Sequence, residues 1–155
     1  MRIKKLRLIL LILIVTGCSK SMDNCEAVSV TAPANEVSNL KSFLTANSII
    51  TTEDARGFFY QITQTGSGTA PTVCSNITVN YEGKLTDGTV FDSGTNVSFP
   101  LENLIIGWQE GIPLIASGGT IILYLPPSFA YGSSGSGSIP GNSNLIFTID
   151  LISIN

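Results

Sequence analysis

Five short motifs in the second half of the chain supply aromatic and branched apolar side chains, together with the carboxylate of Asp92, from five separate segments. The motifs are Val-Asn-Tyr-Glu-Gly at 79–83, Asp-Gly-Thr-Val-Phe-Asp-Ser at 87–93, Ile-Ile-Gly-Trp at 105–108, Phe-Ala-Tyr-Gly at 129–132 and Leu-Ile-Phe at 145–147. Small-molecule sites are concave and mostly apolar, and they carry a few oriented polar groups. A fold that brings the five segments together would therefore form a pocket of this kind.

The chain around these motifs has the pattern of short strands separated by turns. Residues 73–81 alternate, with the apolar side running from Val73 to Tyr81, which is typical of a half-buried strand. Asp87 and Gly88 form a strong tight-turn pair after it. Further strands are predicted at 57–63, 90–91 continued at 97–99, 120–125 and 144–154.

Two short helices complete the pattern. Residues 34–47 carry apolar side chains at helical spacing, including Leu40 and Leu44. Residues 101–108 hold the only plausible helix of the second half, and we expect it to end at Gly107. The order of elements predicts an α+β domain in which an antiparallel β-sheet wraps around a short α-helix, with a short N-terminal helix before it.

The first 17 residues have the composition of an export signal. Basic residues precede an unbroken apolar run at 8–15, and Val-Thr-Gly-Cys follows at 15–18. Such a segment is too short to cross a bilayer as a stable helix and is typical of a secretory signal. The residues before Cys18 resemble a bacterial lipobox, which implies cleavage before Cys18 and a lipid on its thiol. The alternative is an ordinary signal peptide that happens to end near a cysteine.

Removing residues 1–17 leaves an acidic chain of 138 residues. Four basic residues then face eleven acidic ones, so the net charge is −7. Nucleic-acid binding needs Lys and Arg to neutralise phosphates, so this charge argues against it. The remaining length fits one domain plus a short anchor segment, and it contains no second apolar stretch long enough to cross a membrane.

With Cys18 assigned to the lipid, Cys25 and Cys74 are the remaining pair of cysteines. Disulfides persist in exported proteins, so a Cys25–Cys74 bond would join the N-terminal segment to the domain. The alternative is two free thiols. We expect no metal site, because the chain has no histidine and no Cys-x-x-Cys pair.

The usual catalytic groups are mostly missing. Without histidine the chain has no Ser/His/Asp triad and no imidazole base, and Cys74 lacks a base to activate it. The Ser/Gly run at 133–137 lacks the lysine and the strand-to-helix context of a phosphate-binding loop, so it is interpreted as a flexible flap. The composition therefore favours chemistry that needs no proton shuttle.

Taken in order, the five motifs resemble the FKBP family of peptidyl-prolyl cis-trans isomerases, over residues 57–155. Together with the export signal and its lipobox, this resemblance divides the chain into a lipoprotein signal peptide at 1–17, a lipid-anchored tether with the N-terminal helix at 18–56, and the isomerase domain at 57–155. It implies an FKBP-like fold, no cofactor, and acceleration of X-Pro isomerisation in proline-containing polypeptides.

The resemblance also implies roles for individual residues. Trp108 corresponds to the floor beneath the proline ring, the Tyr131 hydroxyl to a donor to a substrate carbonyl, and the Ile105 N–H to a donor to another. Asp92 is the only acidic residue among the expected pocket residues, and it would orient its neighbours and polarise the substrate amide. The expected catalytic residues are Tyr81, Phe91, Asp92, Trp108, Tyr131 and Phe147. The expected substrate-binding residues are Val97, Leu104, Ile105 and Ile139.

Three departures from the family pattern predict modest activity, one of them Asn103 at a position that is often Gln or Glu. Val97 stands where the family often has an aromatic residue, so one wall of the pocket would be thinner. The flap at 133–138 is almost all Ser and Gly and lacks the bulky residue that many members place there.

The leading hypothesis is a monomeric, lipid-anchored prolyl isomerase of the cell envelope that assists the folding of exported proteins. It would act by desolvating and binding the twisted amide in an aromatic pocket, and its anchor would sit in the outer membrane. The alternative is a non-catalytic FKBP-like chaperone or protein-binding module at the same place. A third, remote interpretation is a structural lipoprotein in which Trp108 is core with no adjoining cavity.

Overall fold

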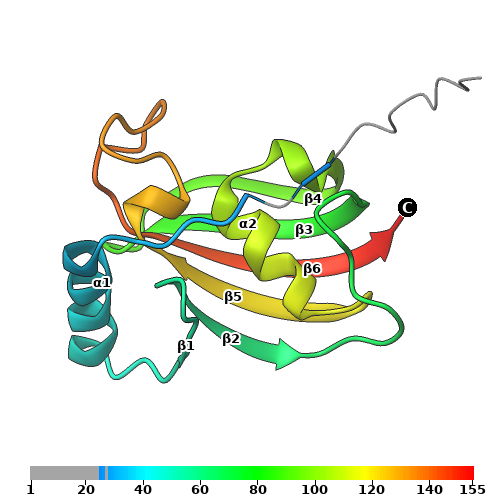
Figure 1. Ribbon diagram of the computed structural model, residues 1–155, viewed down its shortest axis with the longest axis horizontal. Coiled ribbons are helices and arrows are strands. Elements are labelled where there is room, and N and C mark those ends of the chain that lie inside the picture. The colour runs from blue at the N-terminus through cyan, green and yellow to red at the C-terminus, as the bar shows by residue number, and fades with distance from the viewer. Residues whose placement is uncertain (1–24, 27) are drawn as a thin grey trace, which may run out of the picture.

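The computed structural model describes residues 25–26 and 28–155. In this part of the chain six strands form one antiparallel sheet in the order β1-β2-β5-β6-β3-β4 (Figure 1). The strands are β1 (Thr52–Glu53), β2 (Phe59–Gln64), β3 (Asn76–Leu85), β4 (Val90–Pro100), β5 (Gly119–Leu125) and β6 (Leu145–Ile154). The export signal, Cys18 and the boundary expected after residue 17 lie outside the described residues.

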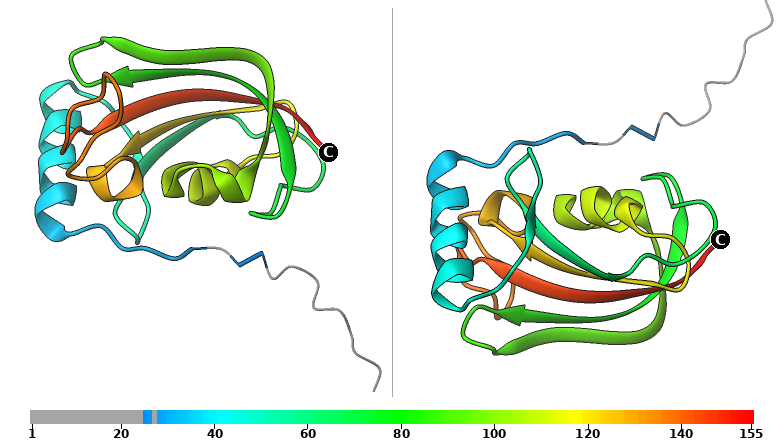
Figure 2. Two further views of the ribbon diagram at one scale, coloured as in Figure 1. Left: turned by 90° about the horizontal axis from the view of Figure 1, so that it is seen from above. Right: turned by 90° about the horizontal axis from the view of Figure 1, so that it is seen from below.

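Two α-helices and three single turns of 3-10 helix accompany the sheet in the described residues. The helices are α1 (Ala34–Ala46) and α2 (Ile106–Gly111), and the turns are η1 (Leu101–Asn103), η2 (Ile112–Leu114) and η3 (Pro127–Phe129). The sheet curves around α2, which lies along its concave face (Figure 2). The expected α+β architecture, a sheet wrapped around a short helix, is therefore confirmed.

The main core fills the space between α2 and the concave face. Alternate residues of β5, namely Ile121, Leu123 and Leu125, are fully buried there, together with Ile112 of η2 and the nearly buried Trp108 of α2. Side chains of the opposite face of the sheet belong to a second, smaller cluster with α1, which crosses one end of the sheet (Figure 1). That cluster is made of Leu40, Leu44, Phe59 and Tyr124.

The helix of the second half begins and ends later than its sequence predicts. Residues 101–103 form only a 3-10 turn, and α2 runs from Ile106 to Gly111, with Gly107 inside it. The reason is packing, because a Cβ atom on Gly107 would lie 2.3 Å from Cδ1 of the buried Leu125. Gly107 is therefore a contact residue between α2 and the sheet, and the expectation that it ends the helix is wrong.

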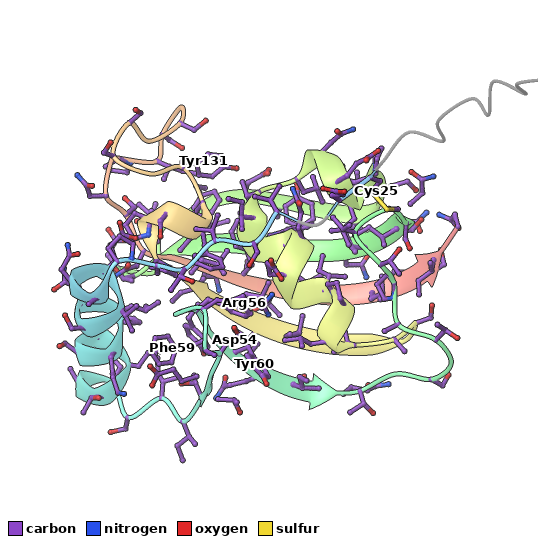
Figure 3. All side chains as sticks on the ribbon, viewed as in Figure 1. Cys25, Asp54, Arg56, Phe59, Tyr60 and Tyr131 are labelled. Atoms are coloured by element: carbon purple, nitrogen blue, oxygen red, sulfur yellow. A yellow bond between two sulfur atoms is a disulfide. The ribbon has the colours of Figure 1, made fainter. Side chains whose placement is uncertain are left out.

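The segment before α1 is tied to the domain at two points. A disulfide joins Cys25 to Cys74, which precedes β3, with 5.6 Å between their Cα atoms (Figure 3). Closer to α1, the Ala32 N–H donates to the Arg56 carbonyl at 2.8 Å. Both ties lie outside the sheet, so they fix the path of the chain toward α1. In the described residues no helix is long and apolar enough to cross a bilayer.

Candidate active site

A pocket of about 150 Å³ opens beside α2 on the concave face of the sheet. It is lined by Tyr81, Asp92, Phe99, Leu104, Ile105, Trp108, Tyr131 and Phe147. These residues come from β3, β4, β6, the loop before α2, α2 itself and the segment after η3. The chain thus brings five sequence-distant segments to one small aromatic cavity. Because a cavity adjoins Trp108, the interpretation of this residue as core without a pocket is wrong.

A wider and more open hollow lies between α1 and residues 53–57, but its charged groups already have partners. Lys41 pairs with Glu53 at 2.8 Å. Arg56 pairs with Glu110 and, at 2.7 Å, with Asp54, which lies beside it in Figure 3. No aromatic side chain lines this hollow. The smaller pocket at Trp108 is therefore the better candidate for chemistry.

Three aromatic rings meet Trp108 at nearly right angles. The centroid of its ring lies 5.2 Å from Tyr81, 5.4 Å from Phe147 and 6.2 Å from Phe99, with interplanar angles of 79° to 89°. Edge-to-face contacts of this kind are favourable because the positive edge of one ring meets the negative face of another. They fix the plane of the indole, which is only 4% exposed. The pocket therefore has a rigid aromatic floor.

The loop before α2 is held by a buried glutamine. The Gln109 side chain donates to the Leu104 carbonyl at 2.7 Å and to the Glu102 carbonyl at 3.0 Å. These bonds fix the backbone just before Ile105. Ile105 is the N-cap residue of α2, with φ −58° and ψ 150°. Within the described residues the Ile105 N–H donates to no hydrogen-bond acceptor. This leaves a backbone donor at the pocket for a bound carbonyl group.

The polar side of the pocket consists of one carboxylate and two phenols. The Tyr81 hydroxyl donates to Oδ2 of Asp92 at 2.9 Å, and the Ser93 N–H donates to Oδ1 at 2.9 Å. Both oxygens of Asp92 are thereby oriented. Burial, and then the charge of Asp92, raises the pKa of the Tyr131 hydroxyl, so it remains a hydrogen-bond donor at neutral pH. Tyr131 follows η3 and is 37% exposed (Figure 3).

We expect the Tyr81 hydroxyl to titrate at high pH. Burial, followed by the hydrogen bond to Asp92 and its charge, raises the Tyr81 pKa to about 12. The unfolded chain has the ordinary tyrosine pKa of about 10, so this contribution to the free energy of unfolding is complete below pH ~10 and is lost as the pH rises to ~12. Ultraviolet titration should show a tyrosine ionisation step near pH 12 in the unmodified protein, and this step should be absent in Tyr81→Phe. If the step that Tyr81→Phe removes lies instead near the ordinary tyrosine pKa of about 10, the prediction is contradicted.

The pocket brings together seven of the ten residues expected at the site, and three lie elsewhere. Phe91 does not line the pocket, and its ring centroid lies 5.5 Å from that of Phe147, which does. Ile139 is buried in the core, and Val97 pairs with Val79 within the sheet. The wall that Val97 was expected to thin is instead formed by Phe99. Val97 therefore does not line the pocket as expected, and the prediction of modest activity stays a prediction.

Phe99 was missed although the sequence carries a weak signal for it. Phe99 lies two positions after Val97, so both side chains point to one face of β4. Gln109 was missed as well, because nothing local in the sequence shows that its amide reaches back to the loop before α2. The described residues contain no group of three or more His, Cys, Asp or Glu side chains that could hold a metal ion.

Comparison with known proteins agrees with this geometry. The profile of the family described as FKBP-type peptidyl-prolyl cis-trans isomerase matches residues 68–152. This chain belongs to the FKBP family. The match covers β3 to most of β6 and every residue that lines the pocket, whereas α1, β1 and β2 precede it.

Curated FKBP relatives are longer than this chain. It is 44% identical over 105 residues to the peptidyl-prolyl cis-trans isomerase Mip of Coxiella burnetii, covering 64% of this chain and 46% of that protein. It is 42% identical over 102 residues to FkpA of Escherichia coli K12, covering 63% of this chain and 38% of that protein. The chain thus spans less than half the length of these two relatives.

Solved FKBP structures have the same fold. The crystal structure of FkpA from Escherichia coli matches with a TM-score of 0.71 and 35% identity, over 79% of this chain and 60% of that one. A peptidyl-prolyl cis-trans isomerase from Pseudomonas syringae pv. tomato matches with a TM-score of 0.69 and 28% identity, over 81% of this chain and 98% of that one. The expected FKBP-like fold is confirmed.

Proposed function

We propose that this protein is a peptidyl-prolyl cis-trans isomerase that accelerates rotation about X-Pro bonds in polypeptides. The observation that carries the proposal is the pocket itself, in which three rings fix Trp108 as a floor beside the oriented carboxylate of Asp92. Membership of the FKBP family and its similarity to proteins named peptidyl-prolyl cis-trans isomerases support it.

The physical task is to lower a rotational barrier without moving a proton. Resonance gives the peptide C–N bond partial double-bond character, which sets a barrier of roughly 18–20 kcal/mol. Water favours the charge-separated resonance form, so a dry aromatic pocket destabilises the planar amide relative to the twisted one. Binding the twisted amide more tightly than the planar one then accelerates the reaction.

Each part of the pocket has a proposed role in that task. The proline ring would rest on Trp108 between Tyr81 and Phe147. The Ile105 N–H and the Tyr131 hydroxyl would donate to the substrate carbonyls on either side of the rotating bond. Asp92 would lie against the twisted amide, held by its bonds to Tyr81 and Ser93. Phe99 joins the wall in place of Val97, and Phe91 packs against Phe147.

A protease-free isomerisation assay on a short X-Pro peptide tests this function directly. Purified protein of residues 19–155 should accelerate the approach to the cis/trans equilibrium. The alternative is a non-catalytic chaperone or binding module, which would bind proline peptides through the same pocket. Saturable peptide binding without acceleration would establish that alternative and exclude the enzyme.

We also propose that the protein is exported and lipid-anchored, with the domains 1–17, 18–56 and 57–155 described above. The basic and apolar segments at the N-terminus and the small residues before Cys18 support this proposal. The anchored domain would act as a monomer at the cell envelope, in the outer membrane, on exported polypeptides. There, slow X-Pro isomerisation limits folding.

Mass spectrometry of the protein extracted from its own membrane checks the anchor. We expect an N-terminal peptide that begins at Cys18 and carries acyl chains, and we expect Cys18→Ser to abolish the modification. The same non-reduced sample should contain one peptide pair linked through Cys25 and Cys74. An unmodified N-terminus elsewhere in the chain would contradict the lipoprotein proposal.

A further inference from the structure

A carboxylate of α1 reaches the segment that carries Tyr131. Oε2 of Glu36, in the first turn of α1, accepts a hydrogen bond from the Ser128 N–H at 2.9 Å, across 92 positions of sequence. α1 lies beside η3 in all three orientations of the structure (Figures 1 and 2). Glu36 precedes residues 68–152, the part of the chain that the family profile matches.

The Ser128 N–H is the first amide donor of η3. Pro126 and Pro127 come before it and have no N–H, so the carboxylate of Glu36 binds the turn at its beginning. Within the described residues the Ser128 hydroxyl is buried without a hydrogen-bond partner. Glu36 therefore provides the side-chain hydrogen bond that fixes this turn to α1.

The same turn determines where Tyr131 lies. The Pro127 carbonyl accepts hydrogen bonds from the Ala130 N–H at 3.0 Å and from the Gly132 N–H at 2.8 Å, one on each side of Tyr131. A displacement of Pro127 and Ser128 would consequently move the tyrosine. Its own side chain is partly exposed, at 37%.

We infer that Glu36 is a positioning residue that holds Tyr131 in register with the pocket through Ser128 and Pro127. The inference rests on the proposed isomerase function, since it concerns the hydroxyl that would donate to the substrate. Catalytic groups must stay within about 0.5 Å of the productive geometry, so an anchor at the base of the Tyr131 segment affects turnover.

The role is separable from the attachment of α1 itself. Leu40 and Leu44 are buried against the sheet, and Lys41 forms an ion pair with Glu53 at 2.8 Å. These contacts remain when the carboxylate of Glu36 is removed. Glu53→Ala is therefore a matched control, because it removes a carboxylate that ties α1 to β1 and leaves η3 unchanged.

The test is a double-mutant cycle on kcat/KM for an X-Pro peptide, using the mature chain. Glu36→Ala should lower kcat/KM by about fivefold, since a displacement of even about 1 Å can cost far more than that. Glu36→Gln keeps an acceptor oxygen and should stay within about twofold of the unmodified protein, as should Glu53→Ala. In a Tyr131→Phe background, Glu36→Ala should cause no further loss, because the hydroxyl that it positions is absent.

Three results would overturn the inference. The first is an unchanged kcat/KM in Glu36→Ala while the unmodified protein is active. The second is that Glu36→Ala lowers kcat/KM by the same factor in the unmodified and the Tyr131→Phe backgrounds. The third is an equal loss in Glu53→Ala. If Glu36→Ala does not fold, Glu36→Asp, which shortens the side chain and keeps the charge, takes its place in the cycle. An unmodified protein without activity would refute the proposed function, and this inference with it.

Discussion

We expect Asp92→Leu to lower kcat/KM for an X-Pro peptide by at least about tenfold, which corresponds to roughly 1.4 kcal/mol of transition-state stabilisation. The substitution removes the single carboxylate that lines the pocket and the acceptor of the Tyr81 hydroxyl. The Tyr81 phenol then loses its partner, and the amide in the transition state loses a fixed negative charge beside it. The assay is run with thermal unfolding of the same samples.

Asp92→Asn separates the two contributions of this side chain. It removes the charge and keeps one oxygen, which can accept from either the Tyr81 hydroxyl or the Ser93 N–H but not from both. If charge is the main contribution, Asn and Leu will lose similar activity, whereas retained activity in Asn assigns the role to orientation of Tyr81. Unchanged kcat/KM in Asp92→Leu, with an intact fold, would show that the site has been placed wrongly.

Much of this pocket could be predicted because its residues lie on neighbouring strands or next to α2. Tyr81 and Phe147 belong to β3 and β6, which pair directly, so the sheet places both rings against Trp108 of α2. Trp108 lies on α2, which packs into the concave face. Motifs spaced along the sequence thus become neighbours through ordinary antiparallel pairing.

The choice between Val97 and Phe99 could not be made from alternation alone. Both residues face the same side of β4, where Val97 pairs with Val79 and Phe99 with Ile77. Which of them reaches Trp108 depends on how the sheet curves around α2. The register shifts opposite Tyr81, near Asn96 at φ 55°, and no local pattern in the sequence specifies that shift.

The hydrogen bonds that hold the loop before α2 and the turn η3 could not be predicted from the sequence either. Gln109 and Glu36 are ordinary polar residues of helices, and each binds backbone groups of another segment. Periodicity predicts that such positions are on a helix but not which loop they meet. The two residues that position Ile105 and Tyr131 were therefore recognised only from their hydrogen bonds.

Gly107→Ala should lower the free energy of unfolding by about 1–3 kcal/mol, the usual cost of forcing an extra carbon into a packed core. At an exposed helical position the same change would stabilise the protein by about 1 kcal/mol, because alanine forms helices better than glycine. Here the new Cβ would lie 2.3 Å from Cδ1 and 2.5 Å from Cδ2 of Leu125, which is fully buried. Steric overlap outweighs propensity, so the sign of the measured change distinguishes the two environments.

A compensating change at the opposite side of the contact makes the argument specific. Leu125→Ala alone leaves a cavity and should cost about 2–5 kcal/mol. In the double variant the new methyl group of residue 107 enters part of that space, so the combined loss should be smaller than the sum of the single losses. Urea unfolding of the unmodified protein, the two single variants and the double variant measures this coupling. Strict additivity would mean that α2 does not pack through Gly107 onto Leu125, and the aromatic floor at Trp108, on the next residue of that helix, would then need another support.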